Sequence, residues 1–162
     1  MVIDYLANHT EAIPVLAAWF HEEWSYLYPE RTLYDVERSI AGRSQVDRIP
    51  IALVAMEAGE VIGTVCLKVH DMDTHLHLSP WLAGLYVART WRGRGIGSAL
   101  VRAMEEKAQE LEVGHLYLYT PDSESFYASL DWRLLERVPY HGSTVAVMEK
   151  QIARGHLGTV YL

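Results

Sequence analysis

The sequence lacks several features that would assign it to a familiar class of protein. Cys66 is the only cysteine in 162 residues, so an internal disulfide has no second thiol. The apolar runs are too short and too interrupted to cross a bilayer, and the first residues show neither the basic nor the apolar segment of a secretory signal. Because a lone cysteine agrees with a reducing compartment, we expect a cytoplasmic protein. Because the apolar runs are short, we expect no membrane partner.

An excess of positive charge and low-complexity tracts are also absent. The formal net charge is -7 at pH 7, which argues against nucleic acid as the main partner. Half of the residues are apolar, so the chain can bury one substantial core, in which we expect Cys66 to lie. We therefore predict a single domain over residues 1–152, followed by a tail at residues 153–162 without clear periodicity.

One long stretch has no acidic residue at all, since neither Asp nor Glu occurs from Thr74 to Met104. Inside it, residues 91–100 read Trp-Arg-Gly-Arg-Gly-Ile-Gly-Ser-Ala-Leu. Four arginines lie in or near this segment: Arg89, Arg92, Arg94 and Arg102. Alternate glycines let the backbone approach a ligand closely, and the first turn of a following helix offers unpaired N–H groups to an anion. These features predict a site for a phosphate-bearing ligand.

Two common phosphate motifs do not fit this segment. A P-loop needs Gly-Lys followed by Ser or Thr, which is absent. A dinucleotide fingerprint would need glycine in place of Ser98 and an acidic residue about 20 positions further on, for which Asp122 is a poor match. An ordinary glycine-rich turn with solvated arginines is the remaining alternative.

Arg92-x-x-Gly95-x-Gly97 instead resembles the pyrophosphate-binding motif of the GNAT superfamily of acyl-CoA N-acyltransferases. The predicted order of elements is similar to that family's. Periodicity predicts a strand at 2–6, helices at 11–24 and 32–43, and strands at 49–57, 61–69 and 81–88. It then predicts a long helix that ends near Gly114, a strand at 115–120, a short helix after Asp122 or Ser123, and strands at 133–138 and 144–149, joined around residues 139–142. We expect Thr10 to cap the first helix, and Thr32 with Asp35 to form a capping box.

The fold implied is α/β (α+β), with a mixed, mostly antiparallel central sheet of about seven strands and helices on both faces. In this family the fourth and fifth strands splay apart, and the pantetheine arm of CoA lies between them. The resemblance places backbone groups of Tyr86 and Val87 at the pantetheine. It places the pyrophosphate at Arg92, Gly93, Arg94, Gly95, Ile96, Gly97 and Ser98.

Phe126-Tyr127-x-x-x-Asp131-Trp132 resembles the family's Phe-Tyr-x-x-x-Gly-Phe stretch, whose tyrosine points at the CoA sulfur. The resemblance makes Tyr127 the catalytic acid, since a neutral phenol can donate a proton to a leaving thiolate. The competing interpretation is that Tyr127 only packs in the core. Asp131 replaces the usual glycine but tolerates a left-handed conformation, and Thr120 stands near the place of a frequent asparagine.

The group that accepts the amine proton does not follow from the sequence. The family often has a glutamate on its fourth strand, whereas residues 82–88 contain no acid. The preceding loop offers Asp71, Asp73, His75 and His77, and imidazole titrates near neutral pH. The same loop can be read as a solvated segment or as a metal site built on His75-x-His77. Nothing else in the sequence requires a metal, so we expect none.

The family's acceptor pocket lies between the first two helices, their connection and the last hairpin. This resemblance places Glu23, Trp24 and Tyr28 near the substrate, and we add Asp73 and His75 from the loop. Aromatic rings and carboxylates together can hold an ammonium group. Trp24 and Tyr28 can equally well complete a core.

The sequence therefore predicts an acetyl-CoA-dependent N-acetyltransferase that acts on a primary amine of a small molecule by direct transfer in a ternary complex. An aminoglycoside-type antibiotic and a peptide N-terminus are alternative acceptors. A CoA-binding sensor without turnover and a metal-binding protein that uses residues 70–77 are alternatives of other classes. Because dimers are frequent in the family, we also expect a homodimer.

Overall fold

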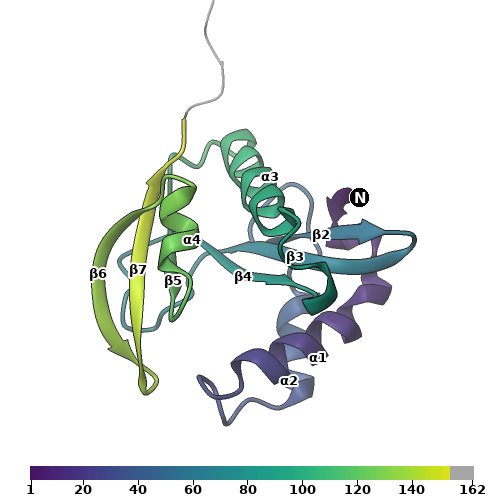
Figure 1. The fold of residues 1–162 in the computed structure, drawn as a ribbon, viewed down its shortest axis with the longest axis horizontal. Coiled ribbons are helices and arrows are strands. Elements are labelled where there is room, and N and C mark those ends of the chain that lie inside the picture. The colour runs from purple at the N-terminus through teal and green to yellow at the C-terminus, as the bar shows by residue number, and fades with distance from the viewer. Residues whose placement is uncertain (154–162) are drawn as a thin grey trace, which may run out of the picture.

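A seven-stranded sheet forms the centre of the structure, a computed structural model that describes residues 1–153 (Figure 1). The strand order is β1-β2-β3-β4-β5-β7-β6. The strands are β1 (Val2–Tyr5), β2 (Ile51–Glu57), β3 (Glu60–Lys68), β4 (Trp81–Val87), β5 (His115–Thr120), β6 (Arg133–Tyr140) and β7 (Ser143–Gln151). Neighbouring strands pair antiparallel except β4 and β5, which are parallel. The predicted mixed, mostly antiparallel sheet is thus confirmed.

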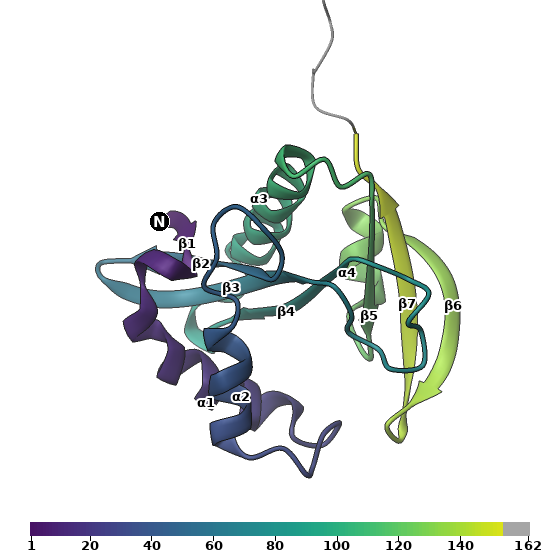
Figure 2. The ribbon, with the colours of Figure 1, turned by 180° about the vertical axis from the view of Figure 1, so that it is seen from behind.

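Helices cover both faces of this sheet (Figures 1 and 2). The helices α1 (Ile13–Trp24) and α2 (Leu33–Ala41) lie on one face of β2–β4, and α3 (Ile96–Glu110) lies on the other. The short α4 (Glu124–Ser129) follows β5. Residues 1–153 also contain three 3-10 turns: η1 (Leu6–Asn8), η2 (Thr10–Ala12) and η3 (Arg89–Trp91). In the part of the chain that is described, no helix is long and apolar enough to cross a membrane.

The starts of the first two helices differ in how well the sequence predicted them. Thr32 and Asp35 form the expected capping box, since Thr32 Oγ1 accepts from Asp35 N at 3.1 Å and Asp35 Oδ2 accepts from Thr32 N at 2.9 Å. The prediction that Thr10 caps the first helix is wrong. The N-cap is Ala12, which is already in the right-handed helical region because η2 leads directly into α1. No extended residue is left there for a capping side chain.

Alternation of side chains along β2 creates two separate cores. Leu53 and Ala55 pack with α3, whereas Ala52 and Val54 point to the opposite face and pack with α1 and α2. Cys66 lies in this second core with 1% of its surface exposed, as predicted, and burial raises the pKa of its thiol. A strand buried on both faces explains why residues 51–56 are continuously apolar.

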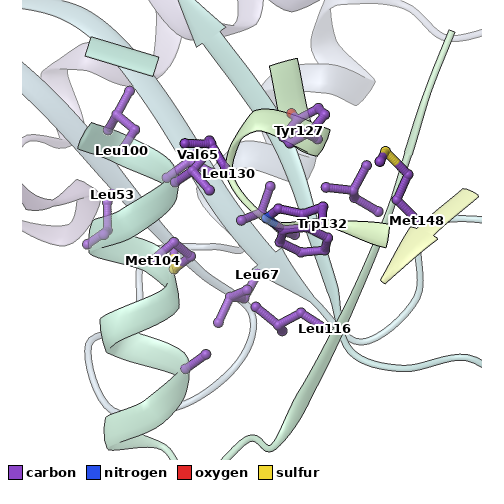
Figure 3. Close-up of a cluster of buried hydrophobic side chains, with 14 of the residues drawn as sticks. Leu53, Val65, Leu67, Leu100, Met104, Leu116, Tyr127, Leu130, Trp132 and Met148 are labelled. Carbon is purple, nitrogen blue, oxygen red and sulfur yellow. The ribbon is translucent and has the colours of Figure 1, made fainter. Parts of the chain in front are cut away.

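The first core extends from α3 across β5 to α4 and β7 (Figure 3). In it, Tyr127 and Trp132 lie beside Leu116 and Met148, on the same face of the sheet as Leu100 and Met104 of α3. The opposite face of β5 and β7 carries a third cluster. Its buried members are Met72, Trp81, Tyr140, Val145 and Val147. The loop between β3 and β4 contributes Met72 to this cluster, which holds the loop against the sheet.

The last hairpin is tighter than predicted. β6 continues to Tyr140, so Pro139 and Tyr140 belong to the strand, and only His141 (φ 48°) and Gly142 (φ 80°) form the turn. Proline is compatible with this position because β6 is at the edge of the sheet. The domain continues to Ile152, which is 7% exposed in the first core. Apart from residue 153, the predicted tail at 153–162 lies outside the described residues.

Asp131 adopts the left-handed conformation, with φ of 69°, where α4 ends. Because glycine reaches this conformation without steric cost, Asp131→Gly is expected to raise the free energy of unfolding by about 0.5 kcal/mol. Asp131→Ala, which keeps a Cβ but loses the side-chain carboxyl, is expected to lower it. Denaturant unfolding of the three proteins tests this. An Asp131→Gly protein less stable than wild type would show that the aspartate side chain outweighs the backbone strain.

Candidate active site

A cleft opens in the sheet between β4 and β5. In residues 1–153 these two parallel strands share a single residue pair, which joins Trp81 at the start of β4 to Tyr117 in the middle of β5. Beyond this pair the two strands run apart toward their carboxyl ends (Figure 1). β4 also carries a bulge, since Gly84 and Leu85 together lie opposite Val65 of β3. The bulge bends the strand next to the opening.

The cleft has a volume of about 910 Å³ and reaches from the start of α3 to the connection between α1 and α2. Its walls are β4, the end of β5 and α4 on one side, and the end of α1 with the turn after it, α2 with Arg43, and the loop after β3 on the other. Segments far apart in the sequence therefore meet in one opening. The two ends of the cleft differ in chemistry.

At one end, the glycine-rich loop leads into an uncapped helix. Gly93 (φ 78°) and Gly95 (φ 79°) are left-handed, and Gly95 is the N-cap of α3. The first-turn backbone bond is Ala99 N to Gly95 O at 3.0 Å, which leaves the N–H groups of residues 96–98 for a ligand. No described side chain caps this turn and it contains no acidic residue. A donor set of this kind fits a pyrophosphate.

The arginines of the loop have different positions. Arg92 lines the cleft, and its Nε donates to the carbonyl oxygen of Val87 at 2.9 Å while its guanidinium lies 5.2 Å from the centre of the Tyr86 ring. Arg92 thus ties the loop to the end of β4. Arg94 is not among the residues that line the cleft, and its guanidinium lies 4.7 Å from the centre of the Trp91 ring, which does line it. The other residues predicted at the CoA site all line the cleft: Tyr86, Val87, Gly93, Gly95, Ile96, Gly97 and Ser98.

Tyr127 lies on α4 at the middle of the cleft. Its ring is 7% exposed and packs edge-on against Phe126 and Trp132. Tyr127 nevertheless lines the cleft. Its hydroxyl has no hydrogen-bond partner within residues 1–153 and is accessible to solvent. Burial, and then the nearby charge of Asp122, raise the pKa of Tyr127 above its ordinary value of 10.0. The ring is therefore part of the core, while the hydroxyl stays protonated and lies at the cleft. The role of Tyr127 as the catalytic acid stays a prediction.

Thr120 orders the turn that leads into α4. Its buried Oγ1 accepts from the backbone N–H of Ser123 at 3.0 Å and of Asp122 at 3.4 Å. Ser123 is the N-cap of α4, as one of the two predicted candidates, but its side chain does not cap the helix. The threonine therefore positions the helix that presents Tyr127.

At the other end of the cleft, most of the predicted acceptor residues come together. Glu23, Trp24, Tyr28 and Asp73 all line it. His75 does not, contrary to the prediction. It is 9% exposed, with Nδ1 bonded to Thr74 Oγ1 and Nε2 to Glu136 Oε1, each at 2.7 Å. The loop folds back against β6, and this turns the imidazole away from the cleft.

The sequence did not reveal a group of tyrosine hydroxyls at this end. The hydroxyls of Tyr28 and Tyr119 are 2.6 Å apart, and Tyr140 Oη accepts from the backbone N–H of Asp73 at 3.4 Å. Burial raises the pKa of Tyr119 and, with Tyr28, that of Tyr140, so these two phenols stay neutral. The alternation of Leu116, Tyr117, Leu118 and Tyr119 was a usable signal, because it places both tyrosines on one face of β5.

The loop at residues 70–77 forms no metal centre in the described part of the chain. Over residues 1–153 no group of three or more His, Cys, Asp or Glu side chains is arranged to hold a metal ion. The rings of His75 and His77 stack with centroids 5.8 Å apart, and Asp71 pairs with Lys68 at 2.9 Å. The metal-binding alternative therefore has no ligand cluster to support it.

Comparisons with known proteins agree with this geometry. Three solved structures superimpose over nearly the whole chain. An aminoglycoside 6'-N-acetyltransferase from Enterococcus faecium has 17% identity and a TM-score of 0.74, with 96% of this chain and 99% of that chain covered. A ribosomal-protein-alanine N-acetyltransferase from Brucella melitensis has 20% identity and a TM-score of 0.74, with 93% and 99% covered. A putative acetyltransferase from Salmonella typhimurium, solved with its cofactor acetyl-CoA, has 14% identity and a TM-score of 0.69, with 99% and 98% covered.

At these identities the structures establish the shared fold and nothing about the acceptor. Among curated protein sequences, the comparison found no match to the chain. The family model described as acetyltransferase (GNAT) family matches residues 13–132, which is more than half of the chain and includes the glycine loop, α3 and Tyr127. The chain therefore belongs to the GNAT acetyltransferase family.

Proposed function

We propose that this protein transfers an acetyl group from acetyl-CoA to a primary amine of a small molecule, directly and within a ternary complex. The observation that supports this most is that a single cleft contains an uncapped helix start, the gap between β4 and β5, and the protonated Tyr127. A sensor that only binds CoA would need the first two features but not the third.

The donor would lie along the β4 side of the cleft. The N–H groups of residues 96–98 would hold its pyrophosphate, and backbone groups near Tyr86 and Val87 would hold its pantetheine arm. Acetyl-CoA supplies a thioester, whose acetyl carbon is the electrophile. Ser98, at the third position of α3, has no acidic neighbour in that turn that would repel the phosphates.

Tyr127 would give its proton to the sulfur as the thiolate leaves. A phenol whose pKa is raised by burial keeps that proton at neutral and moderately alkaline pH, so it is ready to donate. The amine must lose a proton in return. Four carboxylates line the cleft and could receive it directly or through water: Glu23, Asp71, Asp73 and Asp122.

A screen of primary amines with thiol detection tests the proposed function. We expect at least one amine to release CoA from acetyl-CoA much faster than hydrolysis does. Double-reciprocal plots of the initial velocity should then give intersecting lines, as transfer within a ternary complex requires. The screen includes aminoglycosides and peptides with a free N-terminus, the two alternative acceptor classes. If the protein binds CoA while no amine of any class releases it, the sensor alternative replaces the transferase. Parallel lines would instead contradict direct transfer.

We further propose a cytoplasmic location and a homodimer. The location is supported by the single, buried Cys66, which needs no oxidising compartment. Light scattering of the purified chain tests the oligomeric state, and a monomer at micromolar concentration would contradict the dimer.

A further inference from the structure

Arg43 is a buried cation without an anionic partner among residues 1–153. It follows α2, and only 8% of its surface is exposed. Its Nη2 donates to Ser39 Oγ at 3.4 Å, and in the described part of the chain no carboxylate forms an ion pair with it. Its guanidinium carbon lies 5.9 Å from the centre of the Phe20 ring. A permanently charged group in such surroundings is costly unless an anion compensates it.

The guanidinium faces the cleft at the bulge of β4. Arg43, Ser39 and Gly84 all line the cleft, and Nη1 of Arg43 is 3.2 Å from the position that a Cβ on Gly84 would occupy. This part of the wall is formed by α1 and α2, whereas the pyrophosphate end is formed by the start of α3. The anion that would compensate the charge of Arg43 is therefore expected on the acceptor and not among the phosphates of the donor.

Two other cations that line this region, Lys68 and Arg31, are less buried than Arg43. Lys68 pairs with Asp71 at 2.9 Å, and the guanidinium of Arg31 lies 5.8 Å from the centre of the Tyr28 ring. Arg43 is the most buried of the three. Its planar fork of N–H groups matches a carboxylate, which can accept two parallel hydrogen bonds from it.

We propose that Arg43 binds a carboxylate of the acceptor, so that the substrate of this protein is an amino carboxylate such as an α-amino acid. The proposal rests on the proposed function, because it names the class of amine that the transferase uses. Glu23 and Asp73, which also line this end of the cleft, provide negative charge for the ammonium group. In a zwitterionic substrate, the carboxylate would thus face the positive Arg43, and the ammonium group would face the negative Glu23 and Asp73.

Matched acceptors test the proposal. Each L-amino acid is assayed beside its α-amide, which keeps the amine but loses the negative charge. We expect wild type to prefer the acid over the amide by about 100-fold in kcat/KM, the effect of a charge-assisted pair of hydrogen bonds. Arg43→Met is expected to bring this ratio close to one, with the KM for acetyl-CoA unchanged. Arg43→Lys keeps the charge but not the fork, and its ratio should be intermediate.

Arg38→Met is the matched control. Arg38 is on α2, five residues before Arg43, but it is exposed, does not line the cleft and lies over the Tyr34 ring at 5.7 Å. It should keep the wild-type ratio. If Arg43 instead polarised the thioester, Arg43→Met would slow the acids and the amides equally, and the proposal would be wrong.

A binding measurement separates this proposal from the proposed function. In the presence of CoA, N-acetyl amino acids should raise the melting temperature of wild type more than their amides do, and this difference should vanish in Arg43→Met. Without ligands, Arg43→Met should melt no lower than wild type, because it leaves no carboxylate unpaired. A lower melting temperature together with no preference for acids would assign Arg43 a purely structural role. Carboxylate-dependent binding without any acetyl transfer would retain the anion site and reject the transferase.

Discussion

Replacing Tyr127 with Phe is expected to lower kcat for acetyl transfer about 100- to 10,000-fold, which is the range for loss of a general acid. The KM for acetyl-CoA and the melting temperature should stay near the wild-type values. The ring packs against Phe126 and Trp132, and phenylalanine retains these contacts. The hydroxyl has no hydrogen-bond partner among the residues described, so its removal leaves no buried group unsatisfied.

The pH dependence of kcat provides a second test of the role of Tyr127. Because the folded protein raises the pKa of Tyr127 above 10.0, the phenol keeps its proton as the pH rises, and its ionisation should not reduce kcat between about pH 8 and pH 10. Tyr117→Phe is the control, since Tyr117 is on β5 but does not line the cleft, and it should leave kcat unchanged. A Tyr127→Phe enzyme with wild-type kcat would exclude the tyrosine as the acid.

Replacing Ser98 with Asp is expected to have opposite effects on stability and on donor binding. Ser98 is in the first turn of α3, where a negative charge interacts favourably with the helix dipole and should stabilise the fold by about 0.5 kcal/mol. The same charge would face the pyrophosphate. Two like charges about 4 Å apart near a protein surface repel by several kcal/mol, so the Kd for CoA should rise about 100-fold or more.

Ser98→Ala removes the hydroxyl without adding charge and should change the Kd for CoA only slightly. Calorimetric titration with CoA and thermal melting of both variants check the two effects together. If Ser98→Asp binds CoA as tightly as wild type, the pyrophosphate does not lie at the start of α3. A loss of binding that accompanied a loss of stability would point instead to damage to the helix.

Local patterns predicted most of the fold, because local physics decides it. The capping box of Thr32 and Asp35 acts over one helical turn, and the hairpin around Gly59 depends on a two-residue turn. β5 was predicted to the residue, since its alternation matches burial on one face. The glycines before α3 predicted a tight turn and an open helix start for the same reason, as they act through their own backbone, and the structure has both.

The acceptor end was harder to predict because its contacts join distant segments. Tyr28 and Tyr119 are separated by 91 positions, and the partner of His75 is Glu136 on another strand. No pattern in the sequence indicated a functional role for Arg43, which was only the predicted last residue of a helix. Its proposed role depends on its burial and on the absence of a nearby carboxylate among the described residues. Neither property can be derived from the spacing of residues in the sequence.

The separate cores on the two faces of the sheet have a consequence for how this protein can change. Tyr127 belongs to the core built on α3, whereas Phe20 and Trp24 of the acceptor wall belong to or pack against the core under α1 and α2, and Tyr28 and Tyr140 to the third cluster. Mutations of the third cluster therefore need not disturb the packing around Tyr127, whereas changes at Phe20 or Trp24 also reach Tyr86, against which both rings pack. Directed evolution of the cleft could thus vary the wall at Tyr28 and Tyr140 while the core that holds Tyr127 is kept constant.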